Sequence, residues 1–150
     1  MGPPTSDHFE VRRLHPDARL PSRAHEADAG FDLHTIEAFE LAPRQRALIP
    51  TGIAIALPPG TAGLVLPRSG LAASSGVSVL NAPGLVDAGY RGEIKVVLVN
   101  HGSADASFAV GERVAQLFIT ACWTGVAREV EGLPGGTDGR GDSGFGSTGR

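Results

Sequence analysis

Apolar and polar residues alternate along most of this chain from Phe9 onward. Successive side chains of a strand point to opposite faces, so a period of two predicts strands. The segments that alternate in this way, or that form the apolar runs typical of buried strands, are 53–57 (IAIAL), 63–66 (GLVL), 76–80 (GVSVL), 93–100 (EIKVVLVN) and 113–119 (RVAQLFI). Turn sequences separate them. The pattern predicts an all-β domain, either a β-sandwich, a jelly roll or a small barrel.

The ends of the chain differ from this alternating middle. Residues 1–8 are predicted to be a disordered leader, and the strands are predicted to end near Val130. The sequence EGLPGGTDG at 131–139 is typical of a flexible linker, and it leads into a glycine-rich tail. We therefore expect a leader at 1–8, a β-domain at 9–130, and a linker with its tail at 131–150.

Composition narrows the classes of function. The chain has 150 residues, a net charge of −3 and 41% hydrophobic residues, which argues against nucleic-acid and membrane partners. Its single cysteine, Cys122, excludes an internal disulfide, and its five scattered histidines lack the spacing of zinc ligands. It contains no apolar signal core near its start and no run of about 18 apolar residues. We expect a cytoplasmic protein.

The tetrapeptide PRSG at 67–70 is a first candidate site. Arg68 offers a guanidinium group, Ser69 a hydroxyl group, and Gly70 a backbone amide that a ligand can approach closely. A short helix is predicted at 69–76 (SGLAASSG), with a serine cap at its start and a glycine at its end. Free amides at such a helix start favour an anion, best a phosphate. The alternative is a helix cap beside a surface arginine.

The segment NAPGLVDAGYRGEIK at 81–95 predicts two strands around a tight turn. A hairpin of this kind can present backbone amides and carbonyls to the edge of a base, and Asn81 adds an amide side chain. Asp87 follows the turn, where a carboxylate beside phosphate-binding groups can deprotonate a water molecule. The alternative is a hairpin with an aspartate in its loop and Tyr90 on its face.

Two more polar residues lie on apolar strands. Asp32, in AGFDLHT, needs a partner on a half-buried strand, and the pattern leaves open whether this is an arginine or a divalent ion. Gln116, in RVAQLFI, is either a polar residue facing the sheet edge or a ligand donor.

The tail RGDSGFGSTGR at 140–150 cannot build a core, and its glycines are costly to order. Phe145 can stack on a base, a contact typically worth about 1–3 kcal/mol. Arg140, Ser147 and Thr148 can contact phosphate oxygens, and the glycine amides can form a concave nest for an anion. We interpret the tail as a lid that closes over a nucleotide.

Together these stretches resemble the five ordered motifs of the trimeric dUTP pyrophosphatases (dUTPases). The matching stretches, in order, are AGFDL, PRSGLA, NAPGLVDAGYRGEI, GERVAQLFI and RGDSGFGSTG. Their spacing also agrees, and the resemblance covers the chain from about residue 9 to its end. Ser74, Ser75 and Val86 depart from residues common in the family, and none of the three changes a motif core.

The resemblance implies an all-β, jelly-roll-like distorted β-barrel (a dUTPase-like β-clip). It also implies a threefold homotrimer in which the C-terminal arm of one chain closes a site formed by the others. The implied reaction is hydrolysis of dUTP to dUMP and pyrophosphate with Mg²⁺. This reaction removes dUTP from the DNA precursor pool and supplies dUMP for thymidylate synthesis.

The resemblance also implies roles for individual residues. Asp87 would orient the attacking water and contact the 3′-hydroxyl group, and Tyr90 would lie against the sugar and exclude a 2′-hydroxyl group. Asp32 would help to organise Mg²⁺ through water, with the ion held mainly by substrate phosphates. Lys95 lies beyond the hairpin, where the family commonly has a residue that contacts the substrate. The other implied substrate contacts are Arg68, Ser69, Gly70 and Gln116 for phosphates, Asn81, Gly84, Leu85 and Val86 for uracil, and Arg140, Phe145, Gly146, Ser147 and Thr148 in the lid.

Two alternatives remain within the same fold. A dCTP deaminase would release ammonia from dCTP, and it tends to have a longer chain and a glutamate near the base. A β-sandwich protein that binds nucleotide without cleaving it would release no pyrophosphate.

Overall fold

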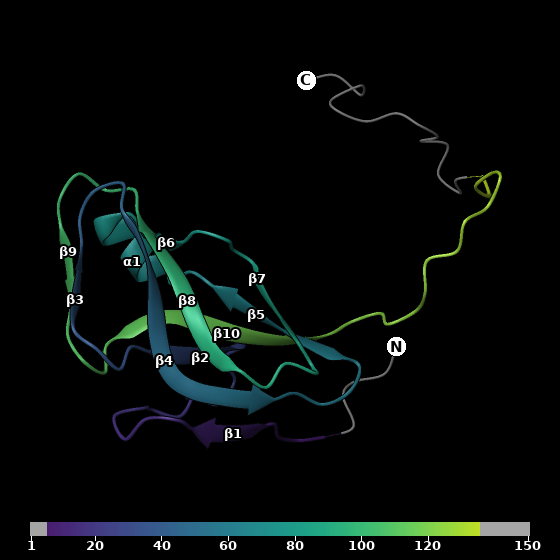
Figure 1. Cartoon of the computed structure of the whole chain (residues 1–150), viewed down its shortest axis with the longest axis horizontal. Helices are drawn as coiled ribbons and strands as arrows, with labels where there is room; N and C mark the ends of the chain where they lie inside the picture. The colour runs from purple at the N-terminus through teal and green to yellow at the C-terminus, as the bar shows by residue number, and fades with distance from the viewer. Residues whose placement is uncertain (1–5, 136–150) are drawn as a thin grey trace.

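The structure is a computed structural model, and it describes residues 6–135. This part of the chain is built from strands and one short helix (Figure 1). The elements are β1 (Glu10–Arg13), β2 (Gly30–His34), β3 (Phe39–Leu41), β4 (Arg46–Ala56), β5 (Thr61–Leu66), α1 (Ser69–Ser75), β6 (Val77–Val79), β7 (Gly84–Asp87), β8 (Glu93–Asn100), β9 (Ala106–Phe108) and β10 (Arg113–Ala121).

The strands form two four-stranded sheets and one pair, all antiparallel. The first sheet has the order β1-β4-β8-β6, the second has the order β2-β10-β5-β7, and β3 pairs with β9. Long crossings between the sheets make neighbours of strands that are distant in sequence. The predicted all-β, jelly-roll-like class is confirmed, and within residues 6–135 the hydrogen bonds define separate sheets.

One hydrophobic core joins all three sheets. Ile49 and Leu98 come from the first sheet, Leu33 and Leu117 from the second, and Phe108 from the pair. Full burial of a side chain of this size contributes about 1.5–3 kcal/mol. The core therefore fixes the outward-facing positions of β2 and β10, where polar residues gather.

The observed strands extend the predicted ones unevenly. The strand predicted at 53–57 is the end of β4, which starts at Arg46. Proline and threonine interrupt the apolar alternation in its first half, so the pattern missed that half. The prediction that strands continue to near Val130 is wrong, because β10 ends at Ala121 and residues 122–130 form no strand.

The predicted hairpin at 81–95 is also wrong in its pairing. β7 pairs with β5 in the second sheet, whereas β8 pairs with β4 and β6 in the first. The segment is therefore an arch that connects the two sheets. A turn in which the Tyr90 amide donates to the Asp87 carbonyl begins the crossing (3.0 Å). Short-range pattern cannot tell an arch from a hairpin, because both alternate in the same way.

The predicted helix at 69–76 is confirmed as α1, with a correction at its start. Arg68, not Ser69, occupies the N-cap position, and no side-chain hydrogen bond caps the helix. Ser69 is instead the first helical residue. The helix ends at Gly76, whose φ of 71° lies in the left-handed region that favours glycine. A Cβ atom there would also lie 2.6 Å from the Gly102 amide nitrogen.

Residues after β10 lead away from the sheets (Figure 1). Trp123, Val126 and Leu133 are exposed on this segment. No helix among residues 6–135 is long and apolar enough to cross a membrane.

Candidate active site

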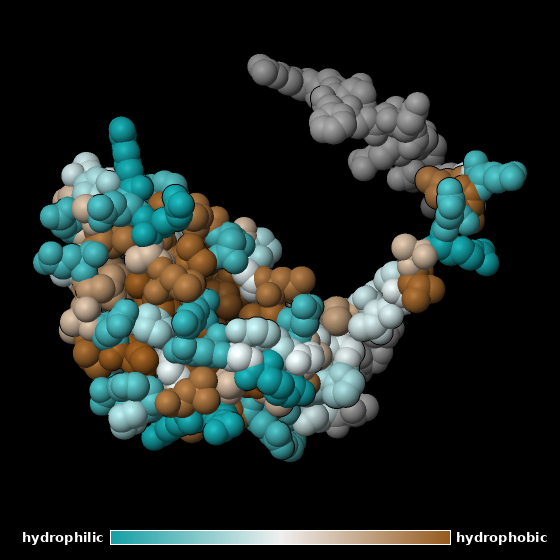
Figure 2. Space-filling view, in the orientation of Figure 1, coloured by the Kyte–Doolittle hydropathy of each residue, from teal (hydrophilic) through white to brown (hydrophobic). Residues whose placement is uncertain are grey.

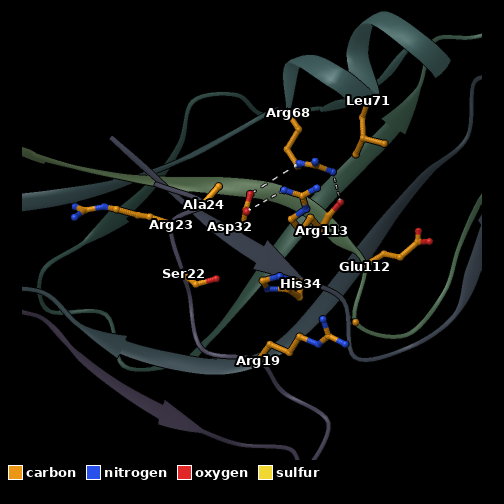
Figure 3. A pocket seen from close by; sticks show the side chains of 11 residues that line it. Arg19, Ser22, Arg23, Ala24, Asp32, His34, Arg68, Leu71, Glu112 and Arg113 are labelled. Carbon is orange, nitrogen blue, oxygen red and sulfur yellow. Dashed lines mark hydrogen bonds and ion pairs between the residues drawn. The ribbon is translucent and has the colours of Figure 1, made fainter. Parts of the chain in front are cut away.

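Polar side chains from β2, β10 and the start of α1 line a cavity of about 580 Å³, which we call the arginine cavity (Figure 3). Asp32 lies between two guanidinium groups. Its Oδ2 atom is 3.3 Å from Arg113 Nη1, and its Oδ1 atom is 4.0 Å from Arg68 Nε. Arg68 Nη1 also donates to the Arg113 carbonyl (2.9 Å). These contacts hold Arg68 and Arg113 with their guanidinium groups beside the cavity.

Strand register explains this arrangement. Asp32 of β2 is paired with Gln116 of β10, and Gln116 is also paired with Leu66 of β5. Gln116 Nε2 donates to the Pro67 carbonyl, which directly precedes Arg68 (2.9 Å). Gly30 leaves the space for this glutamine, because a Cβ atom at Gly30 would overlap the Gln116 amide. Gln116 therefore fixes the backbone from which Arg68 extends.

His34 lies in the same cavity, two residues after Asp32 on the same face of β2. Its side chain is buried, and its Nδ1 atom has no hydrogen-bond partner among the described residues. Burial lowers the pKa of His34. The positive charges of Arg19, Arg113 and Arg68 act in the same direction, while Asp32 opposes them. The lowered pKa favours the uncharged form of this imidazole, which lies beside a cavity rich in arginine.

A second cavity, the Asp87 cavity, lies where the arch crosses between the sheets. Its lining residues are Leu48, Leu85, Val86, Asp87, Tyr90, Ile94 and Lys95. The Asp87 carboxylate is exposed, with no hydrogen bond or ion pair to other residues in the 6–135 range. A carboxylate that is free of partners can accept a proton or position a water molecule.

Tyr90 is held on the rim of the Asp87 cavity. Its hydroxyl group donates to the Glu93 carbonyl (3.0 Å), and its ring lies where a side chain on Gly92 would be. Lys95 Nζ is 3.6 Å from the Glu93 carboxylate, which itself accepts from the Gly52 amide. Asn81 lies near the same segment, because a Cβ atom at Gly84 would be 3.3 Å from Asn81 Nδ2. The arch and the start of β8 thus present the Tyr90 ring, the Asp87 carboxylate, which is unpaired among the described residues, and the Lys95 ammonium group with its partner Glu93.

The predicted site is divided on a single chain. Arg68 and Asp32 line the arginine cavity, whereas Asp87, Tyr90 and Lys95 line the Asp87 cavity, and the two cavities share no lining residue. Ser69 and Gly70 are exposed at the start of α1, beside Arg68. The lid residues predicted at 140–148 lie outside the described part of the chain.

The structure bears on two alternatives that the pattern left open. Asp32 has arginine neighbours in this chain, and its predicted role beside a divalent ion stays a prediction. Gln116 does not face a sheet edge, because β10 lies between β2 and β5.

The sequence interpretation missed several lining residues. His34 lies two residues after Asp32 in the sequence, so the alternation of side chains along a strand already indicates that the two residues share one face of that strand. Arg113 lies opposite His34 on the neighbouring strand, so it could be assigned to the cavity only once the strand register was known. Arg19 comes from a long loop, and Leu48 lines the Asp87 cavity from β4, so only the fold brings them in.

The described residues contain no group of three or more histidine, cysteine, aspartate or glutamate side chains that could hold a metal by themselves. Asp32 and Glu112 are the two carboxylates among the residues that line the arginine cavity. This fits Mg²⁺ bound through water and held mainly by phosphates, since Mg²⁺ commonly takes one or two carboxylates and keeps several waters.

Comparison with known proteins gives matches to one family. The family model described as dUTPase matches residues 16–149. The deoxyuridine 5′-triphosphate nucleotidohydrolase of Rhodococcus erythropolis is 52% identical over 147 residues, which cover 96% of this chain and 88% of that protein. The enzyme of the same name from Mycolicibacterium gilvum is 50% identical, with 96% of each chain covered.

Solved structures give the same result. The dUTPase of Staphylococcus bacteriophage 80alpha with dUpNHpp superposes with a TM-score of 0.89 at 29% identity, covering 97% of this chain and all of that one. A mutant dUTPase from phage phi11 of S. aureus, described for its coordination of a structural Mg(II) ion, has a TM-score of 0.79 at 27% identity and covers 85% of this chain and 99% of that one.

Proposed function

The chain belongs to the dUTPase family, and we propose that it hydrolyses dUTP to dUMP and pyrophosphate. The observation that carries the proposal is the division of polar groups between two cavities. One cavity offers guanidinium groups held in place, and the other offers a free carboxylate beside an aromatic ring. A nucleoside triphosphate presents polyanionic and aromatic parts that match these two chemistries.

The arginine cavity supplies charge for the phosphates. Phosphoryl transfer depends mainly on positioning and on neutralising charge, rather than on covalent chemistry by the protein. Arg68 is fixed by the Arg113 carbonyl and by Asp32, so it loses little side-chain freedom when an anion binds. Ser69 and Gly70 lie beside it for further contacts, and Gln116 supports the backbone of Arg68.

The Asp87 cavity supplies the base for the water. Asp87 would orient a water molecule toward the α-phosphorus and accept its proton, while pyrophosphate leaves in line. Tyr90 would lie against the sugar, and its hydroxyl contact with Glu93 limits its movement. Asn81, Gly84, Leu85 and Val86 would contact uracil, and Lys95 would make a further contact with the substrate.

We include Mg²⁺ in the proposal. Asp32 would hold the ion through water, and the ion would supply neutralisation of the phosphate charge. Asp32 can serve this role because its exposed share faces the arginine cavity, even though both its oxygen atoms have arginine neighbours.

We further propose a homotrimer, in which the arginine cavity of one chain meets the Asp87 cavity of another. Leu48 and Leu80 are 57% and 48% exposed and flank Val97 across neighbouring strands. Figure 2 shows hydrophobic surface on this face, over β4, β6 and β8. Exposed apolar rows of this kind mark contacts between proteins. Native mass spectrometry should give three times the chain mass, and a monomer as the main active species would contradict the proposal.

We propose that the tail acts as a lid, because its composition suits a nucleotide contact and its sequence resembles the last motif of the family. Arg140, Phe145, Gly146, Ser147 and Thr148 would close over the bound nucleotide. Deletion of residues 140–150 should strongly reduce turnover of dUTP, and normal kinetics in the deletion variant would refute the lid. The proposed place of the reaction is the cytoplasm.

The decisive experiment measures pyrophosphate release from dUTP with Mg²⁺, beside dTTP, dCTP and UTP. Selective cleavage of dUTP would support the reaction, and it would show that the site rejects both the thymine methyl group and the ribose 2′-hydroxyl group. Release of ammonia from dCTP would favour a deaminase. Binding of dUTP without pyrophosphate release would leave a nucleotide-binding protein.

A further inference from the structure

Glu93 is the first residue of β8, and the resemblance implies no role for it. Its side chain is 24% exposed, and each of its carboxylate oxygens has a neighbour. Oε1 accepts a hydrogen bond from the Gly52 amide of β4 (2.9 Å), whereas Oε2 lies 3.6 Å from Lys95 Nζ. Only the first contact has the length of a hydrogen bond, so this carboxylate is tied mainly to the backbone of the neighbouring strand.

Gly52 gives the Glu93 side chain a fixed point on β4. The pairing of β4 with β8 shifts register between Pro50 and Ala54, which leaves Gly52 inside a bulge. Its φ of 68° favours glycine, and a Cβ atom there would lie 2.9 Å from the Ile36 side chain. The Glu93 carboxylate therefore supplies an acceptor for the Gly52 amide at a point where the ladder of strand hydrogen bonds is interrupted.

The backbone of Glu93 holds the ring of Tyr90. The Glu93 carbonyl accepts the Tyr90 hydroxyl group (3.0 Å), and the ring lies where a side chain on Gly92 would be. Tyr90 is 46% exposed, and residues 88–92 form no strand, so neither packing nor strand pairing fixes the hydroxyl end of the ring. Tying the Glu93 side chain to β4 therefore limits where its carbonyl can lie, and with it the Tyr90 ring.

We propose that Glu93 is a positioning residue, which ties the Tyr90 ring to the bulge of β4 and so sets how strictly the enzyme selects deoxyribose over ribose. The inference rests on the proposed function, because it takes from there that the ring lies against the sugar. A ring held at its hydroxyl end leaves less room for a 2′-hydroxyl group than a ring that can tilt away.

The first test follows the Tyr90 ring in the full-length protein without substrate. Tyr90 is the only tyrosine of the chain, so protein made with ¹³C-labelled tyrosine gives ring NMR signals from this residue alone. Glu93→Ala removes the acceptor of the Gly52 amide and should shift the ring signals toward those of a tyrosine in a solvated peptide. Glu93→Gln keeps an oxygen that can accept from this amide but loses the charge that faces Lys95, and its ring signals should stay close to those of the unaltered protein.

The second test measures kcat/KM for dUTP and for UTP. Glu93→Ala should lower the ratio of the two values about tenfold, as expected for one lost hydrogen bond, and Glu93→Gln should restore most of the ratio. A loss of folded protein alone would lower both values together and leave their ratio unchanged. Glu10→Ala is the matched control, because Glu10 is an exposed carboxylate on the same sheet, opposite Ala56 of β4. It should change neither the ring signals nor the ratio.

Two further variants keep the test decisive. If Glu93→Ala does not fold, Glu93→Asp replaces it, because the shorter side chain keeps the charge but withdraws the carboxylate from the Gly52 amide. Tyr90→Phe removes the hydroxyl group that meets the Glu93 carbonyl, so it should lower the ratio by itself. In the Tyr90→Phe background, Glu93→Ala should lower the ratio little further, since both changes break the same connection.

Four results would overturn the proposal. They are unchanged ring signals in Glu93→Ala, an unchanged ratio in that variant, an equal fall of the ratio in Glu93→Gln, and effects of Tyr90→Phe and Glu93→Ala that simply add. The NMR measurement separates this inference from the proposed function. If the unaltered protein does not cleave dUTP, the proposed function fails, while the ring signals still decide whether Glu93 holds Tyr90.

Discussion

The arginine cavity and the Asp87 cavity are organised in opposite ways. In the first, side chains hold one another: Asp32 pairs with two arginines, and Arg68 also donates to the carbonyl of Arg113. In the second, the backbone of the arch carries Asp87, whose carboxylate has no partner among the described residues, and the rim side chains Leu85 and Tyr90 are exposed.

This difference suggests that the arginine cavity positions the substrate and that the Asp87 cavity carries out the proton transfer. A cluster of mutually held charges presents fixed cations to an anion, and it binds without much loss of side-chain freedom. A free carboxylate on an arch is suited to moving a proton, and it needs a second surface to exclude water. Changes in the first cavity should therefore act mainly on binding, and changes in the second mainly on turnover.

The largest expected effect comes from Asp87→Asn. The amide keeps the size of the side chain and removes its basicity, so kcat should fall about 10²- to 10⁴-fold while KM changes little. The thermal midpoint should stay the same, because Asp87 is exposed and forms no described contact that folding depends on. Near-normal turnover of dUTP in this variant would show that Asp87 is not the base.

A smaller effect is expected from Arg68→Lys in the arginine cavity. Lysine keeps the charge but cannot donate to the Arg113 carbonyl and approach Asp32 with the same geometry. We expect kcat/KM for dUTP to fall about 10- to 100-fold, mainly through KM, which steady-state kinetics can separate. Arg46→Lys on the other sheet is the control and should change nothing. A loss confined to kcat would mean that the two cavities do not divide binding from turnover.

Mixing these two variants tests whether the cavities act in one site across chains. Co-expression of Asp87→Asn and Arg68→Lys chains with different tags should yield mixed trimers in which about a third of the sites combine two unaltered cavities. Activity should then rise to about a third of the unaltered level, measured on trimers that carry both tags. Activity no higher than the mean of the two variants would mean that each site is built from a single chain.

The sequence predicted the fold class well because the core alternates with a period of two. It placed β5, β8 and β10 nearly at their observed bounds, since each has an apolar face bounded by turn residues. It failed where pairing decides the structure. The arch from β7 to β8 has the same alternation as a hairpin, and the partner sheet of each strand is a long-range property.

For the candidate site too, the sequence indicated individual residues but not how the fold places them relative to one another. Candidate residues such as Arg68 and Asp87 stand out because few residue types can do their chemistry, whereas their separation into two cavities depends on the fold. Arg19 gave no signal, because a loop arginine is ordinarily a solvated charge, and only its position over Gly111 brings it to the cavity. The cap of α1 was misassigned for a simpler reason, since Arg68 takes the cap position without a side-chain bond and Ser69 begins the helix.

The smallest expected effect concerns pH and the buried histidine of the arginine cavity. Burial lowers the pKa of His34 below its usual 6.5, so on acidification the unfolded chain takes up this proton before the folded chain does. Stability should therefore fall as the pH drops below about 6.5, and this fall continues until the lowered pKa is reached. The free energy of unfolding, measured with urea between pH 8 and pH 5, should decline less steeply in His34→Asn than in the unaltered protein. Parallel curves would show that the imidazole is not desolvated in the folded state, and that the arginine cavity is as open to water as the Asp87 cavity.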